Sequence, residues 1–309
     1  MKTSRQVLVY LLVFASALMA QDAPQFSAVQ RLANRELNLK FNTAAGKNWR
    51  LEGSTNLVQW TAMATLLSTG SVAYVDSGAP FMAQRFYRAA SVDGTNILTG
   101  DHLATDRGDA VIHPINHATF VIGWHGIMIY VDPVGGSAPF QGLPRADLVL
   151  ITHDHTDHFD TSTVTSVKGT NAVIIAPLLV SQKLSASLKS ITTVMTNRAK
   201  MDILGLSVEA MPMYNLTSSW HVKGAGNAYI LTLGAKRVYV AGDTEDIPEM
   251  LALRDIDVAF LPINQPYTMT PAQALHAVKA FRPKVLYPYH YSSADLTSFK
   301  QSVTTDLGV

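Results

Sequence analysis

Three histidines and three aspartates lie within residues 151–160, "ITHDHTDHFD", although the whole chain of 309 residues has only 10 histidines. Alternate residues of an extended segment point the same way, so His153 and His155 are positioned to bind one metal ion. Asp157 and His158 follow where the chain turns, and they face a second ion nearby. Imidazole and carboxylate ligands without sulfur suit zinc, with manganese or iron as alternatives. The competing interpretation is a polar surface turn rich in His and Asp.

The apolar run "ADLVLIT" (146–152) directly precedes this cluster and predicts a strand buried on both faces. The ligands would therefore lie at a sheet edge that a substrate can reach. The segment 119–133 predicts two strands that meet at Gly123–Gly126, and residues 178–188 predict a helix. A second helix is predicted at 270–281, with Thr270 as its N-cap and Pro271 in its first turn. Further apolar strands are predicted at 171–177, 206–213, 228–234, 237–243 and 258–264. Strands mixed with helices in this order indicate an α/β fold with sheets covered by helices.

The pattern HxHxDH formed by His153, His155, Asp157 and His158 resembles the signature of the metallo-β-lactamase fold superfamily. The resemblance covers residues 101–309. It implies a four-layer αββα fold, in which two sheets are sandwiched between helices and two divalent metal ions lie along one edge.

Downstream segments extend the resemblance in the same order. "VYVAGDTEDIPEM" is similar to the segment whose aspartate bridges both metals, which implies that role for Asp243. "LYPYHY" implies that His290 joins Asp157 and His158 on the second metal, and "IYVDP" implies that Asp132 supports the ligand loop. Together, "NHATF", "AGDT" and "YPYHY" most resemble the branch that includes ascorbate-6-phosphate lactonase and N-acyl-phosphatidylethanolamine-type phospholipase D.

The chain departs from the superfamily pattern at one ligand. The histidine that completes the first metal site usually follows a strand, and here Asn215 occupies that place after "SVEAMPMY". His221 follows six residues later, and because imidazole binds zinc better than an amide oxygen does, we expect His221 to be the third ligand. The alternative is that His221 only lines the pocket and the first site is weak or empty.

Two other residues are candidates for contact with the substrate. His117 in "NHATF" either faces the metals or is a hydrogen-bonded strand histidine. Tyr267 either donates a hydrogen bond to the charge that develops on the substrate during the reaction or only packs against its neighbours. The remaining histidines are expected to be structural or exposed: His102, His113, His125 and His276.

These features favour a hydrolase. Between two ions, bound solvent becomes a hydroxide near neutral pH, which attacks an ester, lactone, amide or phosphodiester, while Asp157 orients it and passes a proton to the leaving group. One alternative is a secreted metal-binding or ligand-sensing protein without turnover, and another is a nuclease of the same fold. No basic run is present, and removing Lys2 and Arg5 from the 24 basic residues leaves 22 against 23 acidic ones. We therefore expect a small-molecule substrate and no nucleic acid.

The N-terminal third differs in character. Residues 1–20 have a basic start, a short apolar run and small residues before Gln21, which predicts a cleaved signal peptide and a secreted or periplasmic protein; an uncleaved anchor helix is the alternative. Residues 21–92 alternate like strands and resemble small β-sandwich modules of secreted bacterial proteins, which implies attachment to a surface or glycan. Residues 93–100 are expected to be a linker before the catalytic domain at 101–309. No later span of a membrane is expected, and the absence of cysteine excludes disulfides and thiolate ligands.

Overall fold

The computed structural model describes residues 8–11, 24–94, 97–292 and 294–307, which form two compact units. The first unit contains residues up to Ala104 together with 111–113, and the second contains 105–110 and the chain from Pro114 onward. Most of the predicted signal peptide lies outside the described residues. Within it, only Leu8–Leu11 is described, as the short strand β1 that pairs parallel with β7 (Gln84–Val92).

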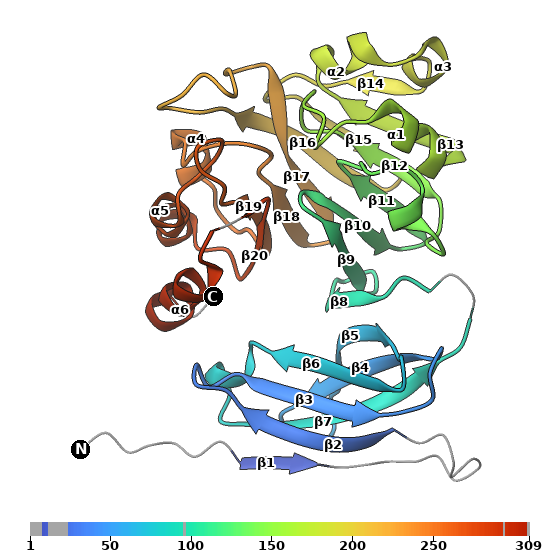
Figure 1. Cartoon of the computed structure of the whole chain (residues 1–309), viewed down its shortest axis with the longest axis vertical. Helices are drawn as coiled ribbons and strands as arrows, with labels where there is room; N and C mark the ends of the chain where they lie inside the picture. The colour runs from blue at the N-terminus through green and yellow to red at the C-terminus, as the bar shows by residue number, and fades with distance from the viewer. Residues whose placement is uncertain (1–7, 12–23, 95–96, 293, 308–309) are drawn as a thin grey trace. The chain divides into compact units, whose positions relative to one another are not determined.

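The described part of the first unit consists of strands and one short 3-10 turn, η1 (Ala79–Phe81) (Figure 1). One antiparallel sheet has the order β2 (Gln25–Arg31), β3 (Leu37–Asn42) and β6 (Ser71–Asp76). In the other, β4 (Asn48–Ser54) lies between β7 and β5 (Thr61–Leu67), and β5 also pairs with β8 (Gly100–Leu103). Alternate residues of β3 and β4 share one core, which includes Leu39, Phe41, Trp49 and Leu51. The segment predicted as a linker thus ends where β8 begins.

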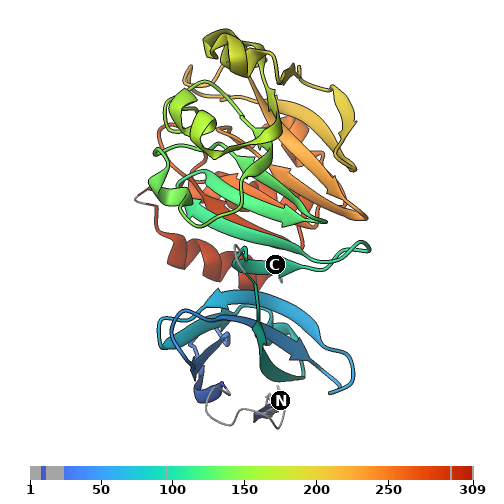
Figure 2. The same ribbon diagram turned by 90° about the vertical axis from the view of Figure 1, so that its right-hand side faces the viewer.

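The second unit contains two mixed sheets (Figures 1 and 2). The strands of the first are, in order, β9 (Ala110–Asn116), β10 (Thr119–Trp124), β11 (Ile127–Val131), β12 (Ala146–Leu150), β13 (Lys168–Ala176) and β14 (Thr192–Val194). Residues 111–113 of β9 are assigned to the first unit. The strands of the second are β15 (Lys200–Ile203), β16 (Leu206–Met213), β17 (Gly226–Leu233), β18 (Lys236–Val240), β19 (Val258–Pro262) and β20 (Val285–Tyr289). The rings of Phe120 in β10 and Phe260 in β19 stack with centroids 3.9 Å apart, so the two sheets pack on each other.

Three helices pack against the second sheet. These are α4 (Pro248–Leu251), α5 (Pro271–Phe281) and α6 (Leu296–Leu307). Val278 of α5 and Phe299 of α6 share a buried core with Tyr239 and Leu261 of the sheet. The predicted start of α5 is confirmed: Thr270 caps it, its side chain accepting a hydrogen bond from Gln273 N while the side chain of Gln273 bonds back to Thr270 N.

The prediction of one helix over residues 178–188 is wrong. The segment forms two short helices, α2 (Leu178–Lys183) and α3 (Ala186–Lys189). The break has a physical cause: Ser185 adopts an extended conformation and its side chain caps α3 by accepting a hydrogen bond from Leu188 N. The remaining helical elements of this unit are α1 (Thr161–Val167) and the 3-10 turn η2 (Ala138–Phe140).

The turn predicted between residues 119 and 133 lies at His125 and Gly126, which both have positive φ and join β10 to β11 as a hairpin. Among the described residues, none of the helices is long and apolar enough to cross a membrane.

Candidate metal centre

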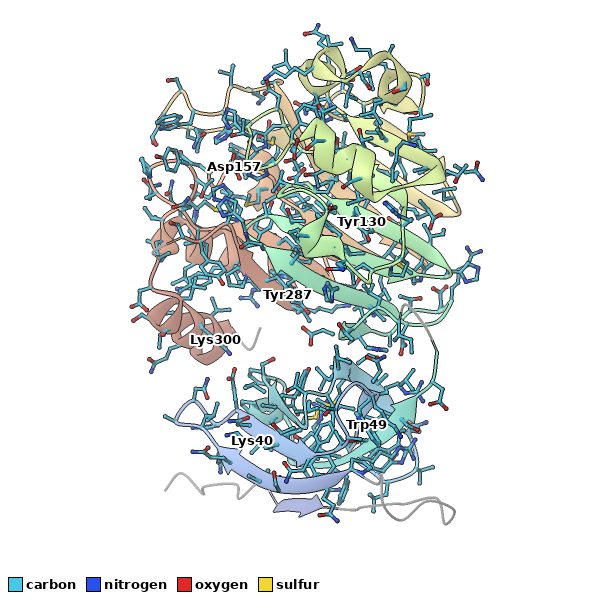
Figure 3. The ribbon with its side chains drawn as sticks, turned by 45° about the vertical axis from the view of Figure 1, so that its right-hand side comes forward. Lys40, Trp49, Tyr130, Asp157, Tyr287 and Lys300 are labelled. Atoms are coloured by element: carbon cyan, nitrogen blue, oxygen red, sulfur yellow. The ribbon has the colours of Figure 1, made fainter. Side chains whose placement is uncertain are left out.

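Seven candidate ligands from distant parts of the sequence lie together in the second unit. The loop after β12 supplies four of them: His153, His155, Asp157 and His158 (Asp157 is labelled in Figure 3). Of the other three, Asp243 follows β18, His290 follows β20, and His221 lies in the loop after β16. Strand ends that meet at one edge place these side chains side by side. Ligand atoms within 4.8 Å of one another define three overlapping groups. The first group contains His153, His155 and His221, and the second contains His117, Asp157, His158 and His290. The third, His153, His158 and Asp243, shares a histidine with each of the other two.

The first group surrounds the Nε2 atom of His221. That atom lies 3.2 Å from His155 Nδ1 and 3.4 Å from Asp243 Oδ2. His153 Nε2 lies 3.9 Å from the same oxygen of Asp243. Three imidazoles and one carboxylate therefore converge on a small volume, which is the donor set of a four-coordinate zinc site.

The second group also contacts Asp243. His158 Nε2 is 3.3 Å from Asp243 Oδ1, and His290 Nε2 is 3.2 Å from Asp243 Oδ2. His290 Nε2 also lies 3.2 Å from Asp157 Oδ2. Among the described residues, the carboxylate of Asp243 thus contacts histidines of both groups.

Three buried polar atoms of this cluster have no hydrogen-bond partner among the described residues: His153 Nε2, His158 Nε2 and Asp243 Oδ1. Leaving such atoms unpaired costs free energy, so buried polar atoms in folded proteins nearly always have a partner. All three belong to groups whose donor atoms converge. Divalent cations would satisfy them together, and the residues present therefore fit metal ions.

Asp132 holds the ligand loop in place. Its side chain is fully buried, its Oδ2 lies 2.7 Å from His158 Nδ1, and its Oδ1 accepts a hydrogen bond from Thr152 N at 2.7 Å. The Thr152 hydroxyl also donates to Oδ2 at 2.6 Å. A carboxylate on the far nitrogen of an imidazole fixes the ring and raises its basicity. Asp132 has a φ of +44°, a strained conformation for a residue with a Cβ atom, which the surrounding bonds must maintain.

Gly226 provides room beside His153, and the sequence alone did not indicate this role. A Cβ atom on Gly226 would lie 3.0 Å from His153 Cβ and 2.8 Å from Met213 Sδ. Its backbone is not in the left-handed region, so the requirement is steric. The glycine allows β17 to approach the ligand loop closely.

Asn215 and His221 both lie in the site, but in different positions. Asn215 is buried behind the ring of His221, with its Oδ1 atom 2.7 Å from His221 Nδ1. Its Nδ2 atom donates to the backbone oxygen of Tyr267 at 2.9 Å and to Glu245 Oε1 at 3.3 Å. In this structure His221, and not Asn215, directs an atom at the cluster.

The protonation states of the first group and of Asp243 favour the binding of a cation. Burial lowers the pKa of His153 well below its usual value, and burial lowers the pKa of His221 to about 4 despite the opposing effect of Asp243. Both rings are neutral at pH 7, so each has a nitrogen lone pair. Burial would raise the pKa of Asp243, but the positive charge of His158 and the hydrogen bond from His290 outweigh it and hold the pKa low.

Two imidazoles of the second group, those of His158 and His290, are protonated at pH 7 in the absence of metal. Burial opposes charge on His158, but the carboxylates of Asp243 and Asp132 raise its pKa well above the usual value. Burial is likewise outweighed at His290, where hydrogen bonds to Asp157 and Asp243 raise the pKa to about 9. Hydrogen bonds from His117 and His290 lower the pKa of Asp157, which is therefore ionised.

His117 joins the cluster, which the sequence left open. Its Nε2 atom lies 3.2 Å from Asp157 Oδ2, and its ring lies 3.8 Å from that of His290. The other histidines lie outside the three groups. His276 is exposed and pairs with Asp246 at 2.7 Å, and His125 forms the hairpin turn. In the first unit, His102 contacts Thr65 and His113 contacts Thr99.

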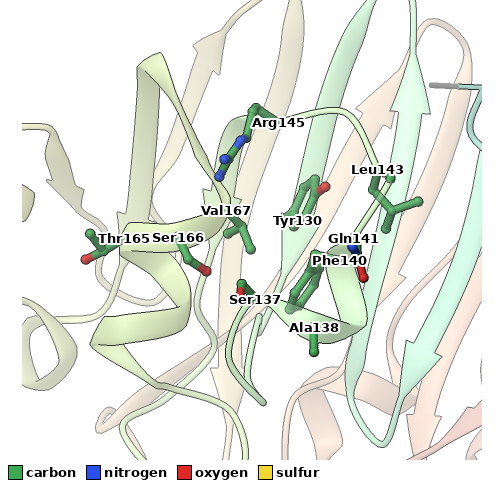
Figure 4. A pocket seen from close by; sticks show the side chains of 11 residues that line it. Tyr130, Ser137, Ala138, Phe140, Gln141, Leu143, Arg145, Thr165, Ser166 and Val167 are labelled. Atoms are coloured by element: carbon green, nitrogen blue, oxygen red, sulfur yellow. The ribbon is translucent and has the colours of Figure 1, made fainter. Parts of the chain in front are cut away.

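A hollow of about 390 Å³ opens beside the cluster. Its lining includes candidate ligands together with Trp220, Tyr267 and Asn264, and it contains no lysine or arginine. A second hollow, of about 700 Å³, lies between η2 and α1. Tyr130, Phe140 and Val167 lie around it with Arg145 at one end (Figure 4), and none of the candidate ligands lines it. The smaller hollow is therefore the candidate substrate pocket.

Comparisons with known proteins agree with this geometry. Residues 112–290, more than half of the chain, match the family model described as a beta-lactamase superfamily domain. The chain is 33% identical over 205 residues to a UPF0173 metal-dependent hydrolase of Thermococcus onnurineus, an alignment that covers 61% of this chain and 90% of the relative.

Solved structures give the same result. The chain is 40% identical, with a TM-score of 0.64, to a protein from Parabacteroides distasonis that is named for metal-dependent hydrolase activity; the match covers 69% of this chain and 96% of that one. It is 27% identical, with a TM-score of 0.54, to the metallo hydrolase Igni18 of Ignicoccus hospitalis, over 63% of this chain and 90% of that one. The predicted superfamily is confirmed, and the chain belongs to the metallo-β-lactamase superfamily.

Proposed function

We propose that the protein is a metal-dependent hydrolase with two divalent ions, zinc first among the candidates. One ion would be held by His153, His155 and His221. The other would be held by His158, His290 and Asp157, and the carboxylate of Asp243 would be shared between the two ions. The observation that carries this proposal is the set of buried atoms on His153, His158 and Asp243 that have no hydrogen bond among the described residues, although their donor atoms converge. The names of the relatives support the same activity.

Ions bound at this centre would act as Lewis acids and lower the pKa of bound water. The protein's own side chains have separate tasks. Asp157 lines the hollow, has a side chain 49% exposed, and is ionised, so it is placed to orient a water molecule and to accept its proton. His117 is not assigned as a ligand, and its Nε2 atom donates a hydrogen bond to Asp157 Oδ2 at 3.2 Å, which helps to keep the carboxylate in position.

The hollow favours carbonyl substrates such as esters, lactones and amides. Its lining has no lysine or arginine. A densely charged phosphate ester would require such cationic side chains in addition to the metal ions. The same property argues against a nuclease, because binding to a nucleic-acid backbone depends on many cationic contacts. Phosphodiesters remain a lesser candidate class.

Other expectations stay proposals about the whole protein. They are a four-layer αββα arrangement of the second unit, a lactonase-like branch within the superfamily, and export through the segment 1–20 into the periplasm or medium. They also include a sandwich-like N-terminal module that attaches the enzyme to a surface or glycan.

Turnover distinguishes the hydrolase from a metal-binding sensor. The zinc-loaded protein should hydrolyse members of an ester and lactone panel, and Asp243→Asn should remove most of the zinc and the activity. His276→Ala is the matched control, because His276 is exposed and lies outside the cluster. Zinc binding with no turnover on esters, lactones, amides or phosphodiesters would instead support the sensor.

A further inference from the structure

Two aromatic side chains are exposed at the hollow beside the metal centre. Trp220 is 52% exposed and Tyr267 is 41% exposed, and their ring centroids lie 4.8 Å apart at an angle of 71°. Both line the same hollow as His155 and His290. Exposed tryptophan is costly in water, and an exposed aromatic pair in a pocket is a common feature of a binding surface.

The aromatic pair is tied to the candidate ligands. Trp220 directly precedes His221 in the sequence. The backbone oxygen of Tyr267 accepts a hydrogen bond from Asn215, and Asn215 in turn contacts His221 Nδ1. Tyr267 N also donates to Asn264 O at 2.9 Å. The backbone of Tyr267 is thus tied to His221 through Asn215, and the ring of Trp220 packs against the ring of Tyr267.

The surroundings define what such a surface would bind. The hollow has room for a small organic molecule and has no cationic side chain in its lining. Of its three aspartates, Asp157 and Asp243 belong to the metal centre, and Asp154 forms an ion pair with Lys183. A flat apolar group would lie against Trp220 and Tyr267 while a polar group reached the ions.

We propose that Trp220 and Tyr267 form the specificity-determining wall of the pocket and bind an aryl group on the acyl side of the substrate. The proposal rests on the proposed hydrolase function, because it takes the hollow as the substrate site. It narrows the substrate class to aryl-bearing esters, lactones or amides.

Equilibrium binding of small acids that the enzyme cannot hydrolyse tests the wall formed by Trp220 and Tyr267 independently of catalysis. Phenylacetate and acetate have the same carboxylate and differ in one phenyl ring, so calorimetry on the zinc-loaded protein should show phenylacetate binding at least about tenfold more tightly. The double variant Trp220→Ala/Tyr267→Ala should bind both acids equally and retain its zinc. Trp220→Phe should keep most of the preference, since an aromatic face remains.

Val222→Ala is the matched control. Val222 is 62% exposed, lies on the same loop, and does not line the hollow, so its removal should leave the preference unchanged. Equal binding of the two acids by the unmodified protein would overturn the proposal. A preference that survives in the double variant would also overturn it.

Hydrolysis separates this proposal from the one on which it rests. Methyl phenylacetate and methyl acetate release the same alcohol, and kcat/KM should favour the aryl ester by about tenfold or more, a difference lost in the double variant. If neither these esters nor any lactone, amide or phosphodiester of the panel is cleaved while phenylacetate still binds preferentially, the hydrolase proposal fails and the aromatic binding surface remains supported. If both esters are cleaved equally, the wall fails and the hydrolase stands.

Discussion

The Nδ1 atom of His221 donates a hydrogen bond to the Oδ1 atom of Asn215 at 2.7 Å. The amide nitrogen of Asn215 fixes the direction of this hydrogen bond. Asn215 Nδ2 donates to Tyr267 O and to Glu245 Oε1, so the remaining amide atom, Oδ1, is the acceptor from His221. The proton therefore resides on Nδ1 of the neutral ring. The lone pair on Nε2 faces His155 and Asp243, where a metal ion would bind.

This bond predicts different effects for two variants. His221→Ala removes a ligand, so metal content should fall from about two ions towards one per chain. Asn215→Ala leaves the imidazole in place and removes only its support, so content at saturating zinc should be nearly unchanged while affinity falls by about 10–100-fold. Metal analysis of both purified proteins measures this. If Asn215→Ala loses the ion and His221→Ala keeps it, the residue at the strand end is the ligand and this assignment is wrong.

Asp132 should matter for metal affinity although it lies behind the ligands. Asp132→Asn removes the charge that faces His158 Nδ1, and zinc affinity should drop by about 10–100-fold. Competition with a chromogenic chelator gives the affinity. Asp147→Asn is the control, because Asp147 is exposed and accepts a hydrogen bond from Met128 N away from the cluster. Equal affinities for the two variants would refute the supporting role of Asp132.

Metal binding should release protons at pH 7. In the metal-free protein the raised pKa values of His158 and His290, the latter about 9, keep both rings protonated at this pH. A metal binds neutral imidazole, so zinc should displace about two protons per chain from these rings, and a proton lost by bound water would add to them. His153 and His221 have lowered pKa values and contribute none. The release from His290 should shrink as pH rises towards 9.

Calorimetric zinc titrations in buffers of different ionisation enthalpy measure this release. An identical heat in every buffer at pH 7 would show that the two rings are already neutral, contrary to the charges described for the second group.

The first unit should be dispensable for the chemistry, because all candidate ligands lie in the second unit. A fragment of residues 95–309 should therefore retain the metal content and most of the activity of the intact chain per folded molecule. Circular dichroism confirms folding before the two are compared. A folded, metal-loaded fragment without turnover would mean that the N-terminal unit completes the site.

Local sequence patterns predicted the parts of this fold that local forces determine. The helix α5 begins where Thr270 and Gln273 form reciprocal hydrogen bonds, and the ligand loop follows the buried strand β12. The break at Ser185 was missed because a serine within an apolar helical pattern gives no clear signal until its side chain caps the next helix.

Long-range contacts account for what the sequence left open. His117 reaches Asp157 only because the turn between β9 and β10, where its φ is +54°, brings it across 40 residues of sequence. The pairing of Trp220 with Tyr267 likewise joins two loops that no periodicity relates. The amide of Asn215 was identified as unusual, but its contact with His221 depends on the course of the loop between them.

Titration of the metal-free protein with zinc, followed by both metal content and ester hydrolysis, tests the central claim most directly. Exhaustive chelation should abolish hydrolysis, and activity should return with zinc or manganese and reach its maximum at about two equivalents per chain. Asp243→Asn should remain inactive at every zinc concentration, because it removes the carboxylate that contacts both groups. Full activity in protein shown to contain no metal would contradict the account.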